Sequence, residues 1–188
     1  MRTHRALLLL GSNLGDRAEV LASARSLLAS VAETTTTGVS QEYETEAWGA
    51  FAEDGKQGYP FLNQAVAVET RLGAEELLDA TQRIERELGR AAHVAEYDPA
   101  TGERLYRART LDIDLLFYDR AVIRTARLTV PHPRLPERRF ALEPAAELWP
   151  DYVHPELKIA LKELFNCFLL GESRLFNLYL HSVCDVNK

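Results

Sequence analysis

The sequence has few of the features that place a protein in a membrane or in a disulfide-bonded fold. No apolar run approaches the ~20 residues that a membrane-spanning helix requires. The run at 7–10 is too short for the core of a signal peptide and leads directly into a Gly-Ser-Asn turn. Only two cysteines occur in 188 residues, Cys167 and Cys184, and they do not form a Cys-x-x-Cys pair. We therefore expect a cytoplasmic protein that begins with a strand and has neither a structural disulfide nor a zinc site.

The sequence also lacks both of the common glycine-rich phosphate-binding loops. Neither Gly-x-x-x-x-Gly-Lys-Ser/Thr nor Gly-x-Gly-x-x-Gly occurs, and Gly-Ser-Asn-Leu-Gly-Asp at 11–16 is by itself only a strand-to-helix turn. The net charge of −6 argues against broad nucleic-acid binding. The charge is uneven, however, because residues 104–139 contain nine arginines and only four acids. A local positive field of this kind suits a small polyanion better than a long one.

Apolar periodicity and turn residues divide the chain into strands and helices. Strands are predicted at 5–10, 34–43, 61–70, 111–118 and 121–123, and helices at 17–31, 74–88, 140–148 and 155–166. The order β-α-β-β-α-β followed by further helices predicts an α+β fold, a ferredoxin-like sandwich whose antiparallel sheet carries its helices on one face. Residues 130–136 contain three prolines and are expected to be irregular, and 91–108 is expected to be a long functional loop. We expect one domain at 1–166 and a C-terminal tail at 167–188, for which the sequence suggests no role.

Two acids in the predicted strand 111–118 are the first candidates for chemistry. Asp112 and Asp114 lie two residues apart, so both carboxylates project from the same face of the strand. Two such carboxylates can share hard cations that also bind phosphate oxygens. The alternative is a solvated face of an edge strand whose acids form ion pairs with neighbouring arginines. The apolar residues around the pair and the local excess of arginine favour a metal site.

Arginines near this strand are candidates for binding phosphate. Arg109 leads directly into the acidic strand, and Arg90 follows a helix stop at Gly89. Guanidinium groups match the geometry of phosphate oxygens, and phosphoryl transfer needs positive charge on those oxygens. Single arginines are more often surface residues, and we interpret those at 120, 124, 134 and 139 in that way.

Aromatic and amide side chains could bind a flat heterocycle. Phe61 and Asn63 lie on the same face of the strand 61–70, so a ring could stack on one and form hydrogen bonds with the other. A core phenylalanine beside a capping asparagine is an equally good interpretation. Trp48, in the preceding glycine-rich loop, could supply a second aromatic wall. His132, in the turn Val-Pro-His-Pro, is either a structural hydrogen-bonding residue or a phosphate contact.

Seven motifs in order give the chain a resemblance to one family. They are GSNLGD at 11–16, YET at 43–45, FLNQAV at 61–66, QRIE at 82–85, LGR at 88–90, RTLDIDLLF at 109–117 and LTVPHPR at 128–134. Within the span 7–150, this set resembles 6-hydroxymethyl-7,8-dihydropterin pyrophosphokinase, an enzyme family of folate synthesis. The resemblance implies a Mg²⁺-dependent enzyme that transfers pyrophosphate from ATP to the hydroxymethyl oxygen of the pterin and leaves AMP.

The resemblance also implies roles for individual residues. Asp112 and Asp114 would bind two Mg²⁺ ions that bridge the triphosphate, while Arg90 and Arg109 would stabilise charge on the migrating phosphates. The nucleotide site would consist of Gln82, Glu85, Arg90, Arg109, Leu115, Arg127, Thr129 and His132. The pterin site would consist of Thr45, Trp48, Phe61, Asn63, Tyr106, Asp112 and Phe140. The family implies small-molecule substrates without nucleic-acid or membrane partners, and we expect a monomer, with a dimer as the alternative.

The sequence departs from the family pattern at several positions. Glu46 and Ala47 stand where members often have two prolines, and Phe61 and Pro133 each replace a frequent tyrosine. The loop 91–108 is longer than in compact members, which leaves the roles of its arginines open. The motifs favour an enzyme over two alternatives, a non-catalytic binding module on the same fold and a nucleic-acid-binding domain that uses the arginine-rich segment.

Overall fold

The computed structural model describes residues 2–46, 59–89, 96–97, 104–105 and 110–170. Its main sheet consists of β1 (His4–Ser12), β2 (Thr34–Val39), β3 (Tyr43–Thr45), β4 (Phe61–Thr70) and β7 (Asp112–Tyr118). The strand order is β2-β4-β1-β7, β3 also pairs with β4, and every pairing is antiparallel. The α-helices are α1 (Arg17–Ser30), α2 (Ala74–Glu87), α3 (Arg139–Leu148) and α4 (Leu161–Leu169). The prediction of an α+β fold with an antiparallel sheet is confirmed.

Shorter elements complete the described chain. Two small hairpins lie apart from the main sheet: β5 (Glu96–Tyr97) pairs with β6 (Arg104–Leu105), and β8 (Ile123–Arg124) pairs with β9 (Thr129–Val130). A single 3₁₀ turn, η1, spans Leu135–Glu137. Among the described residues, no helix is both long and apolar enough to cross a membrane.

Helices α1 and α2 begin where local signals place them. Asp16 caps α1, because its carboxylate accepts a hydrogen bond from the backbone N–H of Glu19 (3.1 Å). At the start of α2, the Glu76 carboxylate accepts a hydrogen bond from the backbone N–H of Gly73 (2.6 Å). Gly89 follows α2 with a φ of 90°, a left-handed conformation that glycine adopts without strain. These termini agree with the predicted helices to within one residue.

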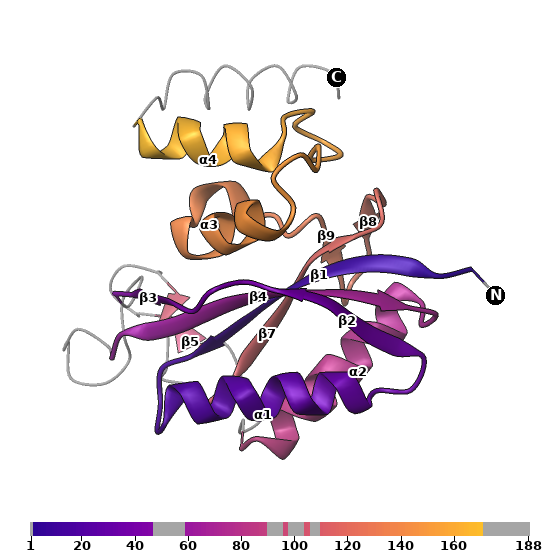
Figure 1. Ribbon diagram of the computed structural model, residues 1–188, viewed down its shortest axis with the longest axis vertical. Coiled ribbons are helices and arrows are strands. Elements are labelled where there is room, and N and C mark those ends of the chain that lie inside the picture. Colours follow the sequence, from indigo (N-terminus) through magenta and orange to yellow (C-terminus); the bar gives the residue numbers. More distant parts are fainter. Residues whose placement is uncertain (1, 47–58, 90–95, 98–103, 106–109, 171–188) are drawn as a thin grey trace.

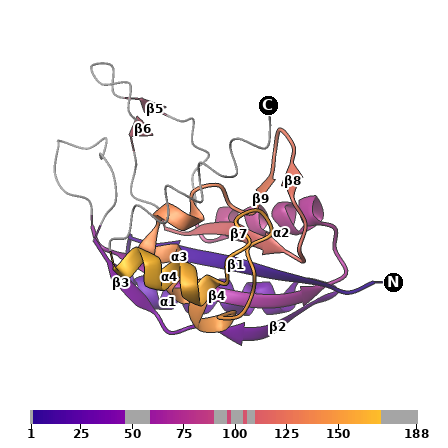
Figure 2. The same ribbon diagram turned by 90° about the horizontal axis from the view of Figure 1, so that it is seen from above.

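The sheet separates two apolar cores. Along β1, Leu8 and Leu10 pack against α1 and α2, whereas Leu7 and Leu9 pack on the opposite side against α3. A continuous apolar run is typical of a strand whose two faces are both covered. Figure 1 shows α1 and α2 below the sheet and α3 and α4 above it, and Figure 2 shows the upper pair lying over β4 and β1. We call these two sides the α1/α2 face and the α3 face.

The prediction that the helices pack on one face therefore holds for α1 and α2 and is wrong for the additional helices α3 and α4. Small side chains on β4, Ala65 and Ala67, let α3 approach the sheet closely, and Leu142 and Ala145 of α3 are fully buried there. The helix predicted at 155–166 begins only at Leu161. The residues before it form a turn in which Lys158 has a positive φ of 60° and the backbone N–H of Lys158 donates to the carbonyl of His154.

Three further boundaries differ from the prediction. The strand expected at 34–43 is divided into β2 and β3, because the chain leaves β2 after Val39 and pairs with β4 again from Tyr43. The proline-rich stretch 130–136 is less irregular than expected, since Val130 belongs to β9 and Leu135 begins η1. The strand expected at 121–123 is found as β8 at 123–124. Helix α4 passes the boundary predicted at 166, and the division into a domain and a tail remains a prediction.

Candidate active site

One row of residues crosses three strands at the end of the sheet where β1 finishes. Gly11 is paired with Asn63 of β4 on one side and with Asp112 of β7 on the other. Ile113 and Leu115 are in the core on the α1/α2 face, so the alternation of β7 turns Asp112 and Asp114 to the α3 face. Neighbouring strands are ~4.8 Å apart, so the backbones of Asn63 and Asp112 lie about 10 Å from each other across β1.

Gly11 leaves space in the middle of this row. A Cβ atom at this position would lie 3.2 Å from Oδ1 of Asn63 and 3.8 Å from the ring of Phe61. Any larger residue would therefore press on the amide. The sequence motif at 11–16 contains this glycine, but its role depends on cross-strand register that the motif does not reveal.

The Asn63 amide is buried and held in one orientation. The residue is 2% exposed, and its Nδ2 donates a hydrogen bond to Oγ1 of Thr45 on β3 (2.9 Å). An amide has two donors and an acceptor with two lone pairs, so this bond uses only part of its capacity. Asn63 is thus a buried polar group with a defined hydrogen-bond partner, beside Phe61 on the same face of β4.

Strand β3 is fastened from both sides. On the α1/α2 face, Arg17 donates to the carboxylate of Glu44 and to the carbonyl of Pro60, each at 2.8 Å. On the α3 face, the hydroxyl of Tyr43 donates to Glu147 (2.8 Å). Burial and then this carboxylate raise the pKa of Tyr43 to about 12, so the hydroxyl remains a donor. The anchoring residues Arg17 and Glu147 carry no sequence signal for such a role, since both resemble ordinary surface charges.

A cavity of about 450 Å³ lies between β3 and the first turn of α3. Thr45 and Phe140 both line it, which places these two predicted pterin residues around one space. The guanidinium of Arg138 lies over the Phe140 ring, with Cζ 5.6 Å from its centroid. Such a contact fixes the orientation of the aromatic side chain.

His132 extends the site toward β7. Its backbone N–H donates to the carbonyl of Leu116 (3.0 Å), and its Nδ1 accepts from the backbone N–H of Arg134 (3.3 Å). Burial and then the positive charge of Arg138 lower the pKa of His132 to about 4, while the negative charge of Asp112 acts in the opposite direction. The imidazole is therefore neutral at pH 7, and because Nδ1 is an acceptor, Nε2 carries the proton. His132 offers one neutral N–H donor near Asp112.

The predicted nucleotide residues flank the outer edge of β7. On α2, Glu85 is buried, and its carboxylate accepts a hydrogen bond from the backbone N–H of Ile113 (2.8 Å). Gln82, also on α2, is half-buried, as is Thr129 on β9. Arg127 is half-exposed and forms ion pairs with Asp79 and Glu75 of α2. These residues surround the edge strand that carries the two aspartates.

The Leu115 side chain is not part of this group. It is 5% exposed and packs in the core on the α1/α2 face, so only its backbone could face a ligand along the edge of β7. Arg90, Arg109, Trp48 and Tyr106 lie outside the residues that the structure describes.

Asp112 and Asp114 form a donor set that suits Mg²⁺. Both are half-buried and point to the same face. Within the described ranges, no group of three or more His, Cys, Asp or Glu side chains could hold a metal ion. Mg²⁺ is usually bound through one or two carboxylates together with phosphate oxygens and water, whereas a metal held by protein alone needs more ligands. The pair therefore fits an ion that arrives with a nucleotide.

Comparison with known proteins identifies the family. Residues 7–150 match the model of the 7,8-dihydro-6-hydroxymethylpterin-pyrophosphokinase (HPPK) family. The chain belongs to this family. The prediction drawn from the seven motifs is confirmed.

Two relatives with this family name are similar over most of their length. The 2-amino-4-hydroxy-6-hydroxymethyldihydropteridine pyrophosphokinase of Bacillus subtilis is 46% identical over 143 residues, which are 76% of this chain and 77% of the relative. The enzyme of the same name from Methylorubrum extorquens is 40% identical over 149 residues, or 79% of this chain and 85% of the relative. The folic acid synthesis protein fol1 of Schizosaccharomyces pombe is 36% identical over 93% of this chain, which spans only 22% of that protein.

Solved structures of HPPK-DHPS proteins share the fold. A Plasmodium falciparum HPPK-DHPS structure with pteroate aligns with a TM-score of 0.67 at 15% identity, covering 94% of this chain and 45% of the other. This chain thus spans about half the length of these longer proteins. At this level of identity the likeness concerns the HPPK fold alone.

Proposed function

We propose that the chain transfers pyrophosphate from ATP to the hydroxymethyl oxygen of 6-hydroxymethyl-7,8-dihydropterin, giving AMP and the pterin diphosphate in folate biosynthesis. Membership of the HPPK family and the names of its relatives support this proposal. The structural observation that carries it is the row Asn63–Gly11–Asp112. This row sets an amide that can read a heterocycle beside a carboxylate pair that suits metal-bound phosphates.

The pterin would bind over the Asn63 end of the row. The buried amide would form hydrogen bonds with the donor and acceptor edge of the ring, and its bond to Thr45 holds it in place for this. Phe61 and Phe140 would pack against the faces of the ring. Trp48 and Tyr106 are proposed to complete this enclosure, and Asp112 would contact the pterin as well as a metal ion.

The triphosphate would bind over the Asp112 end. Asp112 and Asp114 are proposed to hold two Mg²⁺ ions, which when bound neutralise and orient the phosphate oxygens. The neutral His132 would donate its Nε2–H to a phosphate oxygen without adding charge. The remaining nucleotide contacts are proposed for Gln82, Glu85, Arg90, Arg109, Arg127, Thr129 and the backbone of Leu115.

Positioning would supply most of the rate acceleration. Two reactants held in line in one site react as a unimolecular pair, which removes much of the entropic cost of their encounter. Phosphoryl transfer needs little covalent help from the protein beyond placement and charge stabilisation. No protein carboxylate is assigned as a base, because both aspartates of the site are committed to metal.

We also propose the ferredoxin-like arrangement that the sequence predicts. The strand order β2-β4-β1-β7, antiparallel throughout, supports a ferredoxin-like arrangement of the β-α-β-β-α-β core. We also propose a cytoplasmic monomer that acts on small molecules only.

Mass spectrometry of the products tests the proposed reaction. The full chain would be incubated with ATP, Mg²⁺ and 6-hydroxymethyl-7,8-dihydropterin, and the products would be separated and weighed. AMP together with a pterin diphosphate is the expected result. ADP together with a pterin monophosphate, or unchanged substrates, would overturn the assignment.

A further inference from the structure

A second cavity lies at the other end of the sheet, far from the row at Gly11. It has a volume of about 560 Å³, within the range of small-molecule sites. It opens where β1 begins, β7 ends and α3 ends, and it is lined by Arg2, Arg5, Asp119, Arg120, Leu148, Trp149, Pro150, Asp151 and Tyr152. Arg5 and Gly11 are six residues apart on β1, so the cavity lies about 20 Å from the candidate active site.

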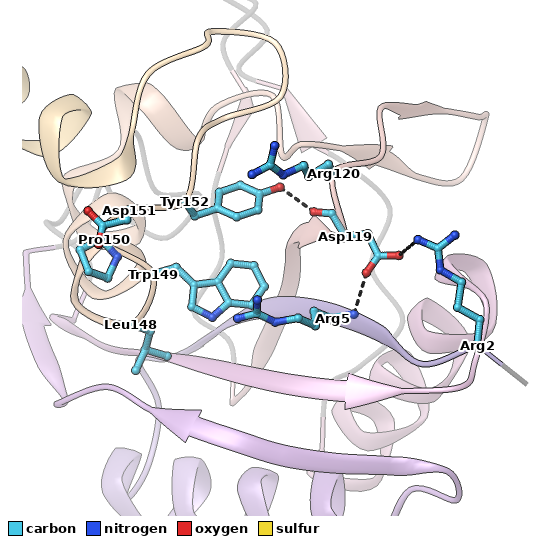
Figure 3. Close-up of a pocket in the computed structure, with 9 residues that line it drawn as sticks. All are labelled: Arg2, Arg5, Asp119, Arg120, Leu148, Trp149, Pro150, Asp151 and Tyr152. Carbon is cyan, nitrogen blue, oxygen red and sulfur yellow. Dashed lines mark hydrogen bonds and ion pairs between the residues drawn. The ribbon is translucent and has the colours of Figure 1, made fainter.

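The back wall of this cavity is aromatic and firmly held. Trp149 is 9% exposed and packs beside Tyr152, with ring centroids 5.2 Å apart. The Tyr152 hydroxyl donates to the backbone carbonyl of Asp119 (2.6 Å), and the ring also packs on Phe117. Burial raises the pKa of Tyr152 to about 12, so the hydroxyl brings no negative charge to the cavity. Figure 3 shows the two rings side by side with arginines on either side of them.

Both carboxylates that line the cavity already have hydrogen-bond or ion-pair partners. The Asp119 carboxylate accepts hydrogen bonds from the backbone N–H of Arg5 (2.8 Å) and from His4 (2.7 Å), and Arg2 lies 3.8 Å away. Asp151 forms an ion pair with Lys162 (2.6 Å). Neither carboxylate is therefore left to neutralise the remaining arginines.

The guanidinium groups of Arg5 and Arg120 also line the cavity. Arg5 lies over the Trp149 ring, with Cζ 5.0 Å from its centroid, and Arg120 lies next to Tyr152 (Figure 3). Throughout the described part of the chain, no carboxylate lies within ion-pairing distance of the side chain of Arg5 or Arg120. The stacking on Trp149 limits the motion of the Arg5 side chain and so reduces the entropy that binding would cost.

We propose that this cavity binds a small molecule that carries a phosphate or carboxylate group on a flat apolar body. The oxyanion would lie between Arg5 and Arg120, whose guanidinium forks match its geometry. The flat body would lie along the edges of Trp149 and Tyr152. The distance from the row at Gly11 makes this site separate from the proposed ATP and pterin sites.

Fluorescence of Trp149 tests the proposal in the full chain. The sequence has two tryptophans, so a Trp48→Phe background leaves Trp149 as the only indole. This protein would be titrated with phenyl phosphate, benzoate, inorganic phosphate and phenol in Mg²⁺-free buffer. We expect saturable changes with phenyl phosphate or benzoate, weaker binding of inorganic phosphate, and no saturable change with phenol. The relative affinity of the first two probes distinguishes a phosphate ligand from a carboxylate ligand.

Substitutions assign the response to the cavity. Arg120→Gln should weaken binding of the better probe about tenfold, the loss of about 1.4 kcal/mol that one charge-assisted hydrogen-bonded contact provides. Arg124→Gln is the matched control, because Arg124 is an exposed arginine nearby that pairs with Glu156 outside this cavity. Asp114→Ala should leave the titration unchanged.

Three results would overturn the proposal. They are the absence of a saturable change at millimolar concentrations of every anionic probe, an equal response to phenol, and a titration that Arg120→Gln leaves unaltered. Circular dichroism of each variant confirms that a lost response is not a lost fold. Calorimetric titration of Arg5→Gln with the same probe measures the loss of binding without relying on the fluorescence of Trp149.

Discussion

The two faces of the sheet are built differently at the level of Gly11. On the α1/α2 face, Leu10 and Ile113 continue the core to the end of the strands. On the α3 face, the core stops at Leu9, and the next positions are occupied by Asn63 and Asp112. One residue step along a strand therefore separates a core position from a site position. The site is formed at the end of the sheet beside the first turn of α3, while the apolar core continues on the opposite face of the same strands.

The largest expected effect comes from removing charge on the open part of the α3 face. Asp112→Ala or Asp114→Ala should lower AMP release by about a thousandfold or more, since each removes a proposed metal ligand at the centre of charge stabilisation. The melting temperature should change little, because both side chains lie at the edge of the core. Glu69→Gln, an exposed carboxylate at the far end of the same sheet, is the control. Full activity in either alanine variant would show that the pair is only a solvated strand face.

The next largest effect is the loss of stability when a buried leucine is truncated in either core. Leu7→Ala and Leu8→Ala remove fully buried side chains on opposite faces of β1, and each should lower the free energy of unfolding by about 2–5 kcal/mol. Urea denaturation measures both, and Val122→Ala, half-exposed at 50%, serves as the surface control. A much smaller loss for Leu7→Ala would show that the α3 layer is peripheral to folding.

Acid should weaken the packing on the α3 face through His154. His154 is 4% exposed, packs edge-on against Phe117, and accepts hydrogen bonds at Nδ1 from the backbone of Glu156 and Leu157. Burial lowers its pKa to about 4, so the neutral form is favoured in the folded state. Its contribution is complete above the ordinary pKa of about 6.5 and is lost as the pH falls toward 4, by about 2 kcal/mol at pH 5.

The histidine effect is measured as the pH dependence of unfolding. His154→Asn keeps an acceptor for the turn but removes the titration, so its stability should fall less steeply between pH 6.5 and 4. His132, which also has a lowered pKa, remains in both proteins as a common background. If the free energy of unfolding depends on pH in the same way in the variant, protonation of His154 is not a cause of the acid destabilisation.

The smallest expected effect comes from filling the space that Gly11 leaves in the row. Gly11→Ala places a Cβ 3.2 Å from the Asn63 amide oxygen, so the KM for the pterin should rise several-fold, about 1 kcal/mol, with little change in the KM for ATP. Gly38→Ala is the matched control, because a Cβ there would make only ordinary contacts of 3.6 and 3.7 Å. Equal kinetics for the two variants would show that the glycine is not needed for the pocket.

Local chemistry explains which parts of the molecule could be predicted. Asp16 and Gly89 mark helix ends through interactions within a few residues, and the alternation in 61–70 fixes which β4 side chains share a face. The cover on the α3 face depends on a helix more than 70 residues further along, so strand periodicity alone could not separate one-sided from two-sided packing. The alanines at 65 and 67 were the available sign of a close helix.

The candidate site shows the same limit. Spacing alone placed Asp112 beside Asp114 and Phe61 beside Asn63, because each pair lies on one strand. The two pairs come close together because Gly11 is the partner of both Asn63 and Asp112. The register between strands that are distant in the sequence cannot be predicted from either segment alone. The family resemblance places Leu115 in the nucleotide site, whereas the alternation of β7 turns its side chain into the core on the α1/α2 face.

Calorimetric titration of two variants tests most directly whether the row divides into a pterin end and a phosphate end. Asn63→Ala should bind a non-hydrolysable ATP analogue with Mg²⁺ as the parent protein does, and should then bind the pterin at least about tenfold more weakly. Asp114→Ala should bind the nucleotide no better with Mg²⁺ than the parent protein does without it. Loss of nucleotide binding in Asn63→Ala, or a full Mg²⁺ effect in Asp114→Ala, would contradict this division of the site.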